Sequence, residues 1–229
     1  MTAVHNDIQI DQIIRSKRRT ISLEVKRDGS LIVRAPRITT HGQIEELVKS
    51  KERWIRKKQE LLKQQSLEVP AKQFLPGEQF LYLGEPYTLE VVNEQADPLV
   101  LKDKFYLAAK SQKKAQLVFT NWYQKHAALV IKEMVVPRAQ QNGFAYARIR
   151  ITSARTRWGS CGPKGSLNFT WRLVMAPREV IDYVVVHEMV HLQVRNHSKA
   201  FWGEVSYLMP EYQHHRAWLK GNGHRLTLD

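Results

Sequence analysis

One predicted helix near the C-terminal end constrains this chain more than any other feature. Between Tyr183 and Leu192 every residue is apolar except His187, Glu188 and His191. A helix that is apolar nearly all round is buried, and an unpaired charge in a buried position costs several kcal/mol. The sequence therefore predicts that the helix lies in the core and that another group compensates these three side chains.

The spacing of the three residues is that of the HExxH motif of zinc hydrolases. His187 and His191 are four residues apart, so both imidazoles lie on one helix face and can bind one metal ion. Glu188 points in a neighbouring direction and can reach a metal-bound water. The alternative is a purely structural helix, in which the histidines donate to backbone carbonyls and the glutamate pairs with an arginine.

A catalytic zinc needs a third protein ligand and an open position. His197 stands six residues after His191, and Asn196 before it tolerates the left-handed backbone that would turn the chain toward the metal. Glu204 is an alternative third ligand, and we favour His197. Glu188 is the predicted catalytic base. The predicted ligands of one Zn²⁺ per chain are His187, His191 and His197.

The charge, the cysteine content and the length of the apolar runs limit the partners and the cell compartment that we expect. The net charge of +14 suggests a polyanionic partner such as nucleic acid, nucleotide or a membrane surface. The charge is not gathered into a basic tail or arm, which favours a solvated surface. The single cysteine, Cys161, cannot form an internal disulfide, which indicates a reducing compartment. No leader segment and no run of about 18 apolar residues is evident, so we expect a cytoplasmic protein without a membrane partner.

Hydrophobic patterns predict strands and one long helix in the N-terminal part. Alternating residues predict a hairpin that turns at Asp28–Gly29. A capping box opens a single helix predicted over residues 40–70. Strand character returns over residues 74–108, with a hairpin around Gly84–Pro86.

Helices dominate the predicted C-terminal part. A long helix is expected from residue 111 to a stop near Pro137. Residues 147–161 and 166–177 are predicted as two strands joined by a glycine-rich turn. Two further helices follow over residues 178–194 and 198–209.

This order of elements predicts an α+β fold in two parts. Residues 1–110 form a β-rich N-terminal part with one long helix, and residues 111–229 form the metallohydrolase region. The boundary is predicted near residue 110, and one compact domain is the alternative.

Three stretches together resemble the YgjP-like metallopeptidases: TRWGSC, HEMVHLQVRNHSKAFW and YLMPEY. These are zincin-like proteins related to the SprT and WLM families, and the resemblance covers most of the chain. It implies a zincin-like fold, an active-site helix with HExxH, and the same zinc ligands and general base. Metzincins have a glycine three residues after the second histidine, and Val194 at this position separates the chain from them.

The predicted function is zinc-dependent hydrolysis of peptide bonds, with a peptide or protein as substrate. A phosphohydrolase acting on nucleotides is the alternative, because the arginine-rich segment 148–158 could hold phosphate oxygens. Against it, no glycine-rich phosphate loop is present. A nucleic-acid-associated module is the third possibility, by analogy with the SprT group.

The stretch that contains TRWGSC has two interpretations. Residues 155–161 or 166–171 could supply an edge strand that pairs with an extended peptide. Equally, Trp158 and Trp171 could pack in the core while Gly159 permits close approach to the helix. Candidates for stabilising a developing oxyanion are Arg155, Arg157, Tyr207 and Tyr212.

Overall fold

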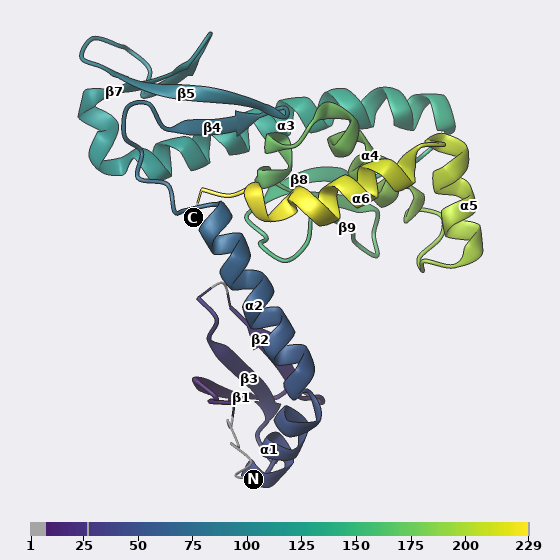
Figure 1. Cartoon of the computed structure of the whole chain (residues 1–229). Coiled ribbons are helices and arrows are strands. Elements are labelled where there is room, and N and C mark those ends of the chain that lie inside the picture. The colour runs from purple at the N-terminus through teal and green to yellow at the C-terminus, as the bar shows by residue number, and fades with distance from the viewer. Residues whose placement is uncertain (1–7, 27, 229) are drawn as a thin grey trace. The chain divides into compact units, whose positions relative to one another are not determined.

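The structure, a computed structural model, describes residues 8–26 and 28–228 and is a mixed α/β protein (Figure 1). It divides into two compact units, Met1–Ala71 and Lys72–Asp229. The buried side chains of residues 72–110 share one hydrophobic core with the later helices, within the second of these units. The division into two parts near residue 110 stays a prediction.

The first unit contains a three-stranded sheet in the order β1-β3-β2, built from β1 (Gln12–Ser16), β2 (Ser22–Val25) and β3 (Leu31–Pro36). Strand β1 is parallel to β3, and β2 is antiparallel to it. The predicted hairpin between β2 and β3 is confirmed. Its turn has Gly29 at a φ of 86°, and the carboxylate of Asp28 accepts from the backbone N–H of Ser30 at 3.0 Å.

Two helices, α1 (His41–Ser50) and α2 (Glu52–Glu68), replace the single helix predicted over residues 40–70. The predicted capping box is confirmed, since Thr40 and Gln43 exchange side-chain to backbone hydrogen bonds. The break falls at Lys51. The hydroxyl of Ser50 donates to the carbonyl of Leu47 at 2.8 Å, and such local bonding competes with the regular helical pattern.

A four-stranded sheet opens the second unit, in the order β4-β5-β7-β6. Figure 1 shows β4, β5 and β7 lying along the first half of helix α3 (Ala115–Asn142). Aromatic rings join the two layers, with Phe80 stacked on Phe119 at 4.3 Å between centroids. The hairpin around Gly84 is confirmed. The strands are β4 (Gln79–Tyr82), β5 (Glu85–Val92), β6 (Leu99–Leu101) and β7 (Phe105–Ala108).

Helix α3 follows the short helix η1 (Ala109–Lys114) and does not stop at Pro137 as predicted. It continues to Gly143, whose left-handed conformation ends it and whose N–H donates to the carbonyl of Ala139. Tertiary contacts hold the extra turn, because Arg138 pairs with Asp182 on the later helix α4 (Arg178–Val190).

A smaller sheet, in the order β8-β10-β9, lies beside α4. The single strand predicted over residues 147–161 is two strands, β8 (Arg148–Thr152) and β9 (Gly159–Cys161). The reason is that both pair with β10 (Ser166–Thr170), β8 parallel and β9 antiparallel, so the chain between them must cross from one side of β10 to the other.

The remaining elements are helical. Helix α4 ends at Val190, before the predicted residue 194, because the N–H groups of Leu192 and Gln193 form tight turns instead. Helix α5 (Lys199–Leu208) agrees with the prediction, and α6 (Tyr212–Asn222) was not predicted. No helix among the described residues is long and apolar enough to cross a membrane. The elements are η2 (Trp171–Met175), α5 (Lys199–Leu208), α6 (Tyr212–Asn222) and η3 (Gly223–Arg225).

Candidate metal centre

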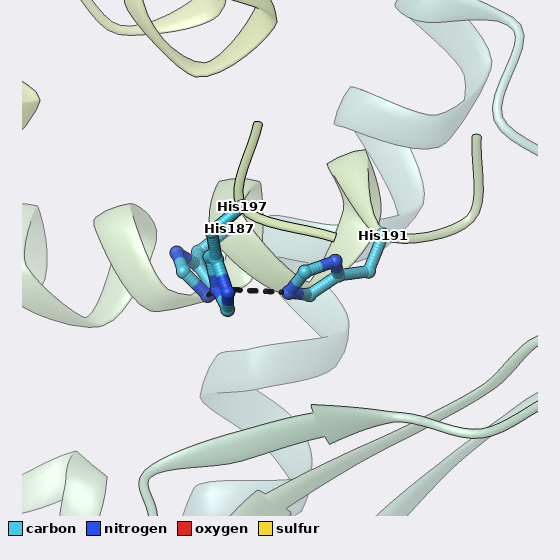
Figure 2. Close-up of side chains that lie close together, drawn as sticks. All are labelled: His187, His191 and His197. Carbon is cyan, nitrogen blue, oxygen red and sulfur yellow. Dashed lines mark hydrogen bonds between the residues drawn. The ribbon is translucent and has the colours of Figure 1, made fainter. Parts of the chain in front are cut away.

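Three histidines converge in the second unit (Figure 2). His187 lies in the last turn of α4, His191 caps that helix, and His197 lies in the loop before α5. The Nε2 atom of His197 is 3.0 Å from Nε2 of His187 and 3.2 Å from Nε2 of His191. The structure therefore brings together the three residues that the sequence predicts as ligands.

The orientation of one ring is set by the backbone. Nδ1 of His191 lies 3.0 Å from the carbonyl oxygen of Val194. A carbonyl oxygen only accepts, so Nδ1 carries the proton and the Nε2 lone pair of His191 points at the other two histidines. Tetrahedral Zn–N bonds of about 2.0 to 2.1 Å place ligand nitrogens roughly 3.3 Å apart. The observed spacing fits a zinc ion.

The surroundings of His187 and His197 favour the neutral form of these two imidazoles. Burial lowers the pKa of His187 to about 3, with help from the charges of His191, His197 and Arg216. Burial also lowers the pKa of His197. A metal binds the neutral imidazole, so this environment favours the ligand form. In addition, Nδ1 of His187 is buried without a hydrogen-bond partner among the described residues.

Glu188 lies on α4 beside His187 and is only 5% exposed. Its side chain packs against the backbone of β9: a Cβ atom at Gly159 would lie 2.5 Å from its Cγ and 2.6 Å from its Oε1. The other carboxyl oxygen, Oε2, has no hydrogen-bond partner in the described part of the chain. Burial raises the pKa of Glu188 to about 8, while the charge of Arg157 and a backbone hydrogen bond from Cys161 oppose the rise.

Aromatic rings from α5 pack around the three histidines. The ring of Phe201 lies 4.5 to 4.9 Å, between centroids, from each of the three imidazoles. Trp202 stacks on His197 at 5.7 Å with an interplanar angle of 27°. These two residues were not predicted to belong to the site. Their signal is the sequence FW, which begins four residues after His197. Helix α5, with Ser198 as its N-cap, directs these two side chains back toward the imidazoles.

Other predicted residues lie elsewhere or play different parts. Glu204 is outside the group of converging ligand atoms. Arg155 lines a separate cavity of about 350 Å³ next to Trp171. Tyr207 is 81% exposed, whereas Tyr212 is buried against Trp202. Of the four oxyanion candidates, Arg157 has a charge that acts on Glu188.

Cys161 is half-buried at the end of β9. Burial is the main cause that raises the pKa of its thiol, which disfavours the nucleophilic thiolate. Arg195 lies beside it and donates to the carbonyl oxygens of Gly162 and Pro163 at 3.1 and 3.2 Å. These two hydrogen bonds from Arg195 therefore stabilise the turn between β9 and β10.

A family model for the YgjP-like metallopeptidase domain matches residues 19–222. The chain belongs to the YgjP-like metallopeptidase family. This membership confirms the resemblance seen in the sequence and makes the chain a metallopeptidase-type hydrolase, a class that implies a bound metal. A search of curated proteins finds no match.

One solved structure that is similar to this YgjP-like chain is the crystal structure of the metallopeptidase zymogen of Pyrococcus abyssi abylysin. The two sequences are 20% identical, and the similarity covers 39% of this chain and 93% of that one, with a TM-score of 0.36.

Proposed function

We propose that this chain is a zinc-dependent metallopeptidase whose metal is held by His187, His191 and His197. The observation that supports it most is the convergence of three Nε2 atoms, all within 4.8 Å of one another, from a helix and the loop that follows it. Three neutral imidazoles with an open fourth position are a ligand set of catalytic zinc. Zinc bound there would polarise the scissile carbonyl and lower the pKa of the attacking water.

Glu188 is the general base in this proposal. It is the residue next to His187, it is buried, and its Oε2 is unpartnered in the described part of the chain. The positive charge of a bound metal would favour the ionised form of Glu188. This carboxylate takes a proton from water as the bond between water oxygen and carbonyl carbon forms. It then gives that proton to the leaving nitrogen as the carbon–nitrogen bond breaks.

In this proposal the substrate backbone lies along β9. Of the two segments considered from the sequence, the one over residues 166–171 contains β10, which already has a strand on each side. Strand β9 is at the edge of the sheet and lies against Glu188. An extended peptide can add to such an edge through backbone hydrogen bonds.

Metal content tests the ligand assignment. We expect about one equivalent of zinc in the untagged protein, which His197→Ala removes and Glu204→Ala leaves in place, measured by elemental analysis after reconstitution and desalting. The reverse result would assign the third ligand to Glu204. No zinc uptake by the unaltered protein would contradict the site as a whole.

Turnover tests the base. A mixture of short peptides is incubated with the zinc-loaded protein, and new termini are identified by mass spectrometry. Glu188→Gln keeps the shape of the side chain but cannot accept the proton, so we expect cleavage to fall by at least roughly 100-fold while zinc stays bound. Undiminished cleavage by this variant would remove Glu188 from the mechanism.

A further inference from the structure

Helix α6 places a cation beside the three-histidine cluster. The guanidinium carbon of Arg216 lies over the ring of Trp202, 4.6 Å from its centroid. Tyr212, one turn earlier on α6, stacks on the same ring at 5.4 Å and 20°. Trp202 also stacks on His197, so a single indole connects Arg216 to a proposed zinc ligand.

The hydrogen-bond donors of Arg216 are available. A guanidinium that lies over an aromatic ring uses its face for this contact, which leaves the N–H groups at its edge free to bind an acceptor. Arg216 is exposed and has no ion pair or hydrogen bond within residues 8–26 and 28–228. Arg138 and Arg195 differ, because the first pairs with Asp182 and the second donates to backbone carbonyls.

The charge of Arg216 reaches the site. It contributes to the lowered pKa of both His187 and His197. A second cation, Arg157, acts on Glu188 from the side of β9. Arg216 and Arg157 therefore bring positive charge to the histidines and to Glu188, respectively.

We infer that Arg216 binds a carboxylate of the substrate and makes the enzyme select acidic peptides. A planar guanidinium with free edge donors can hold a carboxylate through two parallel hydrogen bonds. The carboxylate belongs either to an Asp or Glu side chain near the scissile bond or to the C-terminus of the peptide. This inference rests on the proposed peptidase function and names the substrate class of the same site.

The test compares peptides that differ only in their carboxylates. One uncharged octapeptide is prepared with an amidated C-terminus, with a free C-terminus, and as an amidated series that carries a single glutamate at each position. Binding is measured by fluorescence anisotropy on zinc-loaded Glu188→Gln protein, with and without Arg216→Gln. The control is Arg150→Gln, which makes the same charge change on β8, the strand on the other side of β10 from β9.

We expect at least one carboxylate-bearing peptide to bind about 10-fold or more tightly than the neutral amidated peptide. Arg216→Gln should abolish this preference for carboxylates, and Arg150→Gln should leave it unchanged. Arg216→Lys should keep only part of the preference, because lysine lacks the planar guanidinium that binds a carboxylate through two parallel hydrogen bonds. A preference that follows the free C-terminus assigns the carboxylate to the chain end. A preference that follows glutamate assigns it to a side chain.

Two results would overturn the inference: equal binding of neutral and acidic peptides, or equal weakening of both by Arg216→Gln. Cleavage of the neutral amidated peptide by the protein with Glu188 intact separates the two proposals. If that peptide is cleaved and no carboxylate preference exists, only the role of Arg216 fails. If no peptide in the series is cleaved although binding prefers carboxylates, the carboxylate site stands and the peptidase proposal fails.

Discussion

At the scale of single residues, the position of Glu188 depends on glycine at position 159, which has no Cβ atom. A Cβ atom there would lie 2.5 Å from Cγ of Glu188, closer than carbon atoms can approach. We expect Gly159→Ala to displace the carboxyl group and to lower turnover at least about 10-fold, since small misplacements of catalytic groups are costly. Peptide cleavage and zinc content are measured together, and zinc should stay bound.

Gly203→Ala is the matched control for this change. A Cβ atom at Gly203 meets no atom within 4 Å, and the residue lies inside α5. Turnover should be that of the unaltered protein, and alanine should stabilise the helix by about 0.5 to 1 kcal/mol. Full turnover by Gly159→Ala would show that Glu188 can move without loss of function.

At the scale of elements, α1 begins with two reciprocal hydrogen bonds between Thr40 and Gln43. Thr40→Ala removes the side-chain acceptor for one N–H of the first turn. We expect the free energy of unfolding of the first unit to fall by about 1 kcal/mol. The measurement is urea unfolding followed by circular dichroism.

The control for Thr40→Ala is Thr20→Ala in the same unit. Thr20 is exposed and lies outside any helix or strand, so its substitution should change stability by less than about 0.5 kcal/mol. Equal effects of the two changes would mean that the capping box contributes nothing measurable.

At the scale of the whole molecule, the two units have separate hydrophobic cores. Ile44 is fully buried in the first core and Ile131 in the second. We expect each Ile→Ala substitution to cost about 2 to 5 kcal/mol in its own unit alone. Amide hydrogen exchange with mass spectrometry should show Ile44→Ala losing protection within residues 8–71, while zinc content and protection of α4 stay unchanged.

Ile131→Ala is the reciprocal experiment, and it should lower the protection of α3 and α4 without changing that of β3. Loss of zinc on Ile44→Ala, or loss of protection in both units from either change, would show that the chain unfolds as one cooperative body.

Features that depend on a few neighbouring residues could be predicted from the sequence. The turn at Asp28–Gly29 and the capping box at Thr40 were confirmed, because their hydrogen bonds join residues at most three positions apart. The i, i+4 spacing of His187 and His191 is equally local, and motif spacing alone placed His197 with them. Assignment of these residues as zinc ligands stays a proposal.

Only the tertiary structure decided the features that join distant segments. Helix α3 continues past Pro137, and Arg138 in the turn beyond it pairs with Asp182, 44 residues later. Strands β8 and β9 are separate because each pairs with β10. Arg216 lies near the three histidines because helix α6 packs its guanidinium over the ring of Trp202, which stacks on His197. Periodicity and short motifs record the preferences of neighbouring residues, whereas these contacts depend on which surfaces pack together when the core forms, and no local pattern carries that information.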